Sequence, residues 1–310
     1  MVATPLNVIG ILREAITVLA RNGKFMLQVM LTILFPFSLI GLLHYLLAGF
    51  LIEKVEDSYE NNSPLGQKDV RTLIGLELAF FAALFFVCFF GIMLSIHASA
   101  SSYLGKNMGL NDLISTIHYA WKKPLITWLC VSLFTLTYAV LAIVLIKLVS
   151  LLDPDSYAIY LWGWFLTILA TLFYLYLDAS WTLALVISVL ENDSCGTKGL
   201  KRSEKLIRGR KIQGFLLMFI LTVLVVPIYV LLYVTATGDG DADGNGDELG
   251  PFAQFAFRFV ATVLFCLSKF FVSVVFTVFY YECKQSEGEI VVMELGVGYS
   301  LAPHKLQVEF

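Results

Sequence analysis

The sequence predicts an all-α polytopic membrane protein with six transmembrane helices, arranged as three parallel hairpin repeats that are each preceded by an amphipathic interfacial helix. Three observations predict this class: six long apolar stretches, basic residues concentrated in alternate loops, and a periodic apolar segment before every second stretch. The composition agrees, because 58% of the residues are hydrophobic and 15% are charged. A soluble domain carries about 25% charged residues. We expect the whole chain, residues 1–310, to form a single membrane domain.

The apolar stretches are long enough to cross a bilayer. A transmembrane helix needs about 20 apolar residues to span about 30 Å of hydrocarbon. The predicted spans are residues 25–52, 73–97, 125–152, 158–190, 212–234 and 252–281. They follow an amphipathic arm, residues 1–24, and precede a polar tail, residues 282–310.

The distribution of lysine and arginine predicts the orientation. Fifteen of them lie in the arm, the second loop, the fourth loop and the tail, whereas the other three loops hold three. Basic loops remain in the cytosol. We therefore expect both termini to be cytosolic in an integral membrane protein of the endomembrane system, in the endoplasmic reticulum or secretory pathway, with the plasma membrane as an alternative. No cleavable signal peptide is evident, so the first span is expected to act as the insertion signal.

Three short segments have the periodicity of amphipathic helices. Ile9, Leu12, Ile16 and Leu19 recur at steps of three and four residues before the first span. Before the third span, one helical face carries Leu110, Leu113, Ile114, Ile117 and Trp121. The segment 199–211 before the fifth span has a dense basic face. Such helices either lie in the membrane interface or pack as elbows under the bundle, and we favour the interface.

Basic residues beside these helices are the expected contacts of lipid headgroups. Lysine and arginine close to a membrane surface are attracted to anionic lipids. The predicted contacts are Lys122, Lys123, Lys201, Arg202, Arg208, Arg210 and Lys211.

A motif spans the end of the fourth stretch and the loop after it. An apolar helix ends in Val189-Leu190-Glu191, and Gly199-Leu200-Lys201-Arg202-Ser203 and Gly209 follow. This pattern resembles the membrane domain of bacterial glycerophosphodiester phosphodiesterases and its stand-alone relatives. The whole organisation, with Phe279-Tyr280-Tyr281-Glu282-Cys283-Lys284 after the last span, also resembles a plant family of uncharacterised six-span proteins. The resemblance implies the fold and not catalysis, because the phosphodiesterase chemistry belongs to a separate soluble barrel.

Four of the charged residues within the predicted spans fall into two sets of similar depth. A charge in hydrocarbon needs a partner or a function. Asp178 and Lys269 lie at similar distances from the cytosolic edge, and Glu77 and Arg258 lie at similar distances from the opposite edge. We predict two interhelical ion pairs, Asp178–Lys269 and Glu77–Arg258. The alternative is a polar path for a proton, an ion or a small solute near Asp178 and Lys269, with His44 and His97 as relays.

Two loop motifs suggest ligands on the side opposite the cytosol. Asn61-Asn62-Ser63 is a glycosylation acceptor at Asn61. The fifth loop partly matches a calcium-binding loop but has glycine where the final bidentate glutamate belongs. We favour a disordered acidic linker there and regard weak calcium binding as the alternative. Its candidate ligands are Asp239, Asp241, Asp243, Asn245 and Asp247.

The sequence favours a role without catalysis. It contains no phosphate-binding loop, no metal-spaced cluster of His and Cys, and no evident nucleophile–base pair. We therefore expect no cofactor, no firm metal site and no nucleic-acid partner. The favoured function is that of a membrane-organising or scaffold component that acts on lipids through its cytosolic amphipathic helices. The alternative is a small-solute or ion transporter, and protein partners at the cytosolic loops or tail are a third interpretation.

Overall fold

The fold is that of a computed structural model, which describes residues 6–60, 66–106, 108–152, 157–191, 194–237 and 251–287. Every regular element within these ranges is helical, as predicted. The elements are α1 (Val8–Arg21), α2 (Gly23–Glu60), α3 (Gly66–Tyr103), α4 (Leu110–Ala120), α5 (Lys122–Leu152), α6 (Tyr157–Leu190), α7 (Thr197–Ile207), the 3-10 turn η1 (Arg208–Arg210), α8 (Lys211–Thr237) and α9 (Pro251–Ser286).

Six segments of the described chain are long and apolar enough to cross a membrane, which confirms the predicted number. They are Gly23–Ile52, Val70–Tyr103, Lys122–Leu148, Leu161–Leu190, Thr197–Leu231 and Phe259–Ser286.

Several helices extend beyond the apolar stretches that predict them. α2 continues to Glu60 and α3 begins at Gly66, so most of the expected loop between the first two spans is helical. Helix propagation adds one hydrogen bond for each residue that is fixed, so an established helix continues into polar sequence at little cost. Hydropathy therefore marks the membrane-crossing part of these helices and not their ends.

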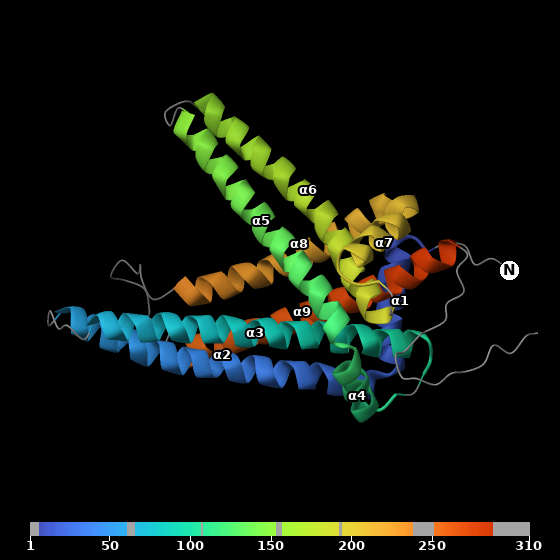
Figure 1. Cartoon of the computed structure of the whole chain (residues 1–310), viewed down its shortest axis with the longest axis horizontal. Helices are drawn as coiled ribbons and strands as arrows, with labels where there is room; N and C mark the ends of the chain where they lie inside the picture. The colour runs from blue at the N-terminus through green and yellow to red at the C-terminus, as the bar shows by residue number, and fades with distance from the viewer. Residues whose placement is uncertain are drawn as a thin grey trace, which may run out of the picture.

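The long helices pack in neighbouring antiparallel pairs, α2 with α3, α5 with α6 and α8 with α9. α1, α4 and α7 gather at one end of the molecule, which we call the base (Figure 1). The pairs diverge from the base, and the α5–α6 pair leaves the α2–α3 pair at a wide angle (Figure 1).

The buried core lies mainly toward the base. It includes Ile187 of α6, Phe276 and Phe279 of α9, and Leu217 of α8, which are all completely buried. Away from the base, large apolar side chains on α2, α3, α5 and α6 face outward. Outward-facing apolar residues suit a helix bundle whose solvent is lipid.

The packed face of α1 overlaps only in part with the one that periodicity selects, of which Leu12 and Leu19 are partly buried against the core. Ile11, Ala15 and Val18 are completely buried in the bundle core, whereas Ile9 and Ile16 are 79% and 58% exposed. α1 therefore has two neighbouring apolar stripes, one facing α3 and α9 and one facing outward. The elbow arrangement accounts for the first stripe and leaves the second available to lipid.

α4 and α7 differ in what they leave exposed. In α4, Leu113 and Ile117 are buried and Ile114 is exposed. In α7, Leu206 and Ile207 are buried, and the exposed residues are mainly charged. Of the three short helices, only α1 and α4 therefore present large exposed apolar side chains among the described residues.

Candidate functional site: a cavity between the helix pairs

A cavity of about 560 Å³ lies within the membrane-spanning bundle. Small-molecule sites typically have volumes of about 300–1,000 Å³. All six long helices contribute to its walls, and most of the lining is apolar. One lining residue from each helix is Phe37 (α2), Gly91 (α3), Ser132 (α5), Asp178 (α6), Met218 (α8) and Lys269 (α9).

The cavity brings together the two charges that the sequence places at similar depth. Asp178 and Lys269 both line it. Lys269 lies ten residues after Phe259 in the last span, which corresponds to about 15 Å along the helix. Asp178 lies twelve residues before Leu190, about 18 Å from the end of its span. Both residues therefore lie too far from the span ends to belong to the membrane–water interface.

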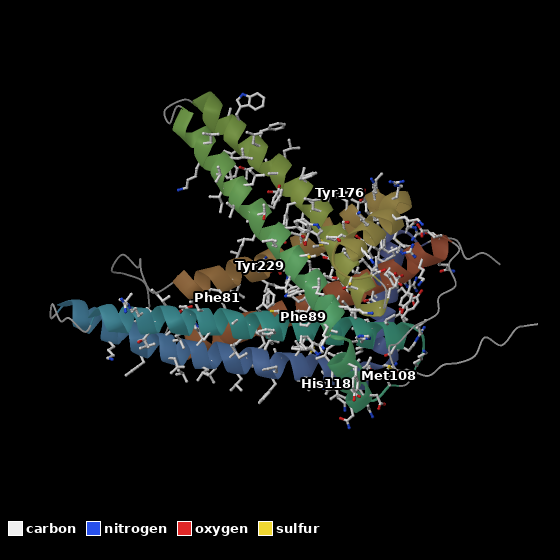
Figure 2. All side chains as sticks on the ribbon, in the orientation of Figure 1. Phe81, Phe89, Met108, His118, Tyr176 and Tyr229 are labelled. Carbon is white, nitrogen blue, oxygen red and sulfur yellow. The ribbon has the colours of Figure 1, made fainter. Side chains whose placement is uncertain are left out.

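The predicted ion pair between Asp178 and Lys269 is not formed as a direct contact. Among the described residues, no hydrogen bond or ion pair within 4.0 Å joins Asp178 to a basic group. The Lys269 ammonium lies instead near two aromatic rings, 5.6 Å from the centroid of Phe265 and 5.8 Å from that of Tyr229. Tyr229, on α8, is labelled in Figure 2. Cation–π contacts of this kind replace part of the lost hydration of an ammonium group.

Holding these charges apart at membrane depth is costly. An isolated charge at the centre of a transmembrane helix costs about 2.5–3.5 kcal/mol on insertion scales, and direct pairing is the usual compensation. Here the opposite charges face a shared space. Such intramembrane residues typically mark a substrate or ion pathway.

Small polar side chains share the cavity lining with the two charges. Ser132 and Thr135 of α5, Thr182 of α6 and Ser273 of α9 line the cavity. Trp128 also lines it, and the indole Nε1–H of Trp128 has no hydrogen-bond partner among the described residues. The walls therefore combine hydroxyl groups, one acid and one base with a mainly apolar surface, which suits a ligand that is itself amphiphilic.

The cavity is closed at one end and open at the other. Toward the base, the lining residues Ile96 and Val186 are almost fully buried. Farther from the base, the lining residue Leu136 is 62% exposed, and Lys269 is also exposed. The opening therefore lies on the side of the cavity away from the base.

Glu77 pairs with His44, a residue that the sequence suggests as a proton relay. The Nε2 atom of His44 lies 2.9 Å from Oε1 of Glu77, and the His44 ring stacks on Phe80 with centroids 3.8 Å apart. The side chain of Arg258 lies outside the described part of the chain, so the predicted Glu77–Arg258 pair stays a prediction. His44 and His97 do not line the cavity, so they do not extend it into a relay.

A cluster of charges joins the ends of α6, α7 and α9 at the base. Glu191 accepts a hydrogen bond from the Tyr280 hydroxyl at 2.9 Å and one from Lys284 at 3.5 Å. Arg202 lies 3.7 Å from Glu191 and 3.8 Å from Glu287. The two sequence motifs that carry the family resemblance thus meet in one place, because Glu191 and Arg202 belong to the first and Tyr280 and Lys284 to the second.

A second charged pair lies beside this cluster and is more deeply buried. Arg210 Nη1 lies 3.6 Å from Glu282 Oε2, and each side chain is only 8% exposed. The backbone N–H of Leu6 donates to the same carboxylate oxygen at 3.1 Å. Glu282 of α9 therefore contacts both η1, through an ion pair, and the segment that precedes α1, through a hydrogen bond.

These contacts correct part of the predicted set of lipid-headgroup contacts. Arg210 is buried against Glu282, and Arg202 is held by Glu191 and Glu287, so both guanidinium groups are engaged within the protein. The exposed members of the set are Lys122, Lys123, Lys201, Arg208 and Lys211. Sequence spacing could not separate the two groups, since all seven residues stand in the same kind of basic segment.

The loop motifs fall outside the described residues. This applies to Asn61 and to Asp239, Asp241, Asp243, Asn245 and Asp247, so glycosylation and weak calcium binding stay predictions. Within the described ranges, no group of three or more His, Cys, Asp or Glu side chains is arranged to hold a metal ion.

The two charges of the cavity are predictable from the sequence, whereas its hydroxyl groups and aromatic walls are not. Ser132 and Thr135 stand three residues apart in an apolar span, so they share a helical face. That spacing was an available signal, although serine and threonine also occur at ordinary helix contacts in membranes. Phe265 in the wall and Tyr229 beside Lys269 gave no signal, because aromatic residues are frequent throughout the spans.

Comparison with known proteins places the chain in a family but does not assign it an activity. No curated protein and no solved structure matches the chain. The resemblance to glycerophosphodiester phosphodiesterase membrane domains therefore stays a prediction that rests on the motif alone. A family model described as a domain of unknown function, DUF8558, matches residues 4–294, almost the whole chain. The chain belongs to the DUF8558 family.

Proposed function

We propose that this protein binds a small amphiphilic molecule in the cavity between its helix pairs and carries it within or across the membrane. The observation that supports this role is the cavity itself, into which Asp178 and Lys269 face from different helices without contacting each other. A scaffold needs no internal space with separated charges, whereas a carrier needs a site that is accessible within the spanning region. The proposal requires no catalytic residue, cofactor or metal ion.

The positions of the basic residues support the proposed orientation. The chain order of the helices supports the proposed repeat organisation. We propose that the base faces the cytosol, because the loops at α4 and α7 carry ten of the eighteen basic residues that lie outside the predicted spans. Each of α1, α4 and α7 precedes one helix pair, an order that supports three parallel repeats. In this orientation, the cavity is closed toward the cytosol and opens toward the opposite leaflet.

Water access to the cavity tests the proposal. Two threonines on α5 offer a matched comparison, because Thr135 lines the cavity and Thr137 is exposed on the outer surface of the same helix. We expect Thr135→Cys to react with a positively charged methanethiosulfonate in lipid nanodiscs at least about tenfold faster than Thr137→Cys. The physical reason is that thiolates form in water and not in hydrocarbon. The five native cysteines are replaced by alanine in both proteins.

Equal and slow labelling at both positions would contradict the proposal, since it would mean that lipid or protein fills the space. Equal and fast labelling would show that the whole outer surface of α5 is in water, which would contradict its assignment as a membrane span.

A second candidate function is the organisation of membrane shape from the base. The observation that favours it is the outward apolar stripe of α1, formed by Ile9 and Ile16, which inserts well into one leaflet. We expect Ile9→Ser with Ile16→Ser to abolish any deformation of liposomes by the reconstituted protein, as seen by electron microscopy. Thr17→Ser on an exposed position of the same helix is the control.

Unchanged liposome deformation in the double variant would exclude this role for α1. Leu113 and Ile117 of α4 are unsuitable for the test because both are buried, and polar residues there would disturb the fold instead of the membrane contact.

A further inference from the structure

The ligand that the cavity can accept is restricted by its two charges. Lys269 lies near the mouth, with its ammonium beside the rings of Phe265 and Tyr229. Asp178 lines the same cavity from α6 and has no ion-pair partner among the residues that the structure describes. A molecule in this cavity can therefore contact both a positively charged group, on Lys269, and a negatively charged group, on Asp178.

We propose that the ligand is a zwitterion with an apolar portion, whose anionic group binds Lys269 and whose cationic group binds Asp178. This inference rests on the proposed function, and it adds the chemical class of the ligand. A ligand with only an anionic group leaves Asp178 unpaired and repels it, and a ligand with only a cationic group does the same to Lys269. A zwitterion pairs both residues and adds no net charge to a site of low dielectric constant.

The rest of the cavity fits the apolar portion. Phe37, Met218 and Leu136 belong to the apolar part of the lining, which is larger than the polar part. A volume of about 560 Å³ suits a small amphiphile and not a full-length membrane phospholipid. Two sources share this chemistry: a short-chain zwitterionic lipid that enters from the bilayer, and an apolar amino acid that enters from water.

Equilibrium binding of chain-matched probes tests the inference on the wild-type protein in maltoside detergent. For the lipid source, the probes are dihexanoylphosphatidylcholine and the anionic dihexanoylphosphatidylglycerol. For the water-soluble source, the probes are leucine, its anionic analogue 4-methylpentanoate and its cationic analogue leucine methyl ester. We expect the zwitterion of one series to bind at least about tenfold more tightly than its singly charged analogues, because each charge-assisted contact is worth about tenfold or more.

Two variants test which residue binds the anionic group of the ligand and which binds the cationic group. Asp178→Asn is expected to remove the advantage of the zwitterion over the anionic analogue. In the leucine series, Lys269→Gln is expected to remove the advantage of leucine over leucine methyl ester. Glu204→Gln and Lys205→Gln, at exposed positions of α7 that do not line the cavity, are the matched controls and should leave the selectivity unchanged.

The outcomes separate this inference from the proposed function. If a singly charged analogue binds as tightly as the zwitterion, the zwitterion assignment is wrong and small-molecule binding stands. If no probe binds but Thr135→Cys is labelled, the zwitterion assignment is again wrong, although the cavity is accessible. If no probe binds and Thr135→Cys is not labelled, both proposals fail. The wild-type comparison needs no substitution, so a variant that fails to fold leaves the test intact.

Discussion

Replacing Arg210 by methionine is expected to lower the free energy of unfolding by about 3–5 kcal/mol, the usual cost of removing one partner from a buried ion pair. Arg210 and Glu282 are each only 8% exposed, and their closest charged atoms are 3.6 Å apart. Without the guanidinium, the Glu282 carboxylate keeps the N–H of Leu6 but loses its counter-charge. The measurement is the denaturation midpoint of the detergent-solubilised protein.

Arg208→Met is the control, because Arg208 is an exposed residue in the same turn. The double variant Arg210→Met with Glu282→Gln should recover much of the loss, since it leaves no unpaired charge in the interior. The ion-pair account would be contradicted if Arg210→Met and Arg208→Met unfolded at the same midpoint.

Filling the cavity with an indole ring is the second change with a large expected effect. Ser132 lines the cavity, whereas the next residue, Leu133, is an exposed apolar residue on the outer surface of α5. We expect Ser132→Trp to slow the thiol labelling of Thr135→Cys by at least about tenfold, because the new side chain occupies the space beside Thr135. The measurement is the labelling rate in nanodiscs.

Leu133→Trp introduces the same side chain one residue away and should leave that rate unchanged. Both proteins must elute as single species and unfold at similar temperatures for the comparison to hold. A similar labelling rate in the two variants would mean that the reagent reaches Thr135 by a route other than this cavity.

The number of spanning helices was predictable because hydrophobic length is a strong constraint in a bilayer. The ends of the helices were not, since hydropathy carries no information about the part that continues into water. α2 shows the difference, because it extends from Ile52 through a charged segment to Glu60. Periodicity found α1, but it could not choose between the stripe of Ile9 and Ile16 and the buried stripe of Ile11 and Val18. Both are apolar, and only the positions of α3 and α9 decide between them.

The candidate site was predictable in its charges but not in its geometry. Counting residues from the span ends placed Asp178 and Lys269 at similar depth, and the structure brings both to one cavity. The same counting could not reveal that the side chains stay apart, because the separation depends on how widely the α5–α6 pair diverges from the other helices (Figure 1). The cavity is the observation that supports a carrier, and it cannot be read from the sequence. The sequence alone therefore favours a scaffold.

The most direct test of the central claim is native mass spectrometry of the protein released from detergent, comparing the wild type with Ser132→Trp and Leu133→Trp. We expect the wild type and Leu133→Trp to retain one small molecule per chain and Ser132→Trp to retain none. Wild-type protein without any bound small molecule, or the same bound mass in all three proteins, would contradict the claim that this cavity is a ligand site.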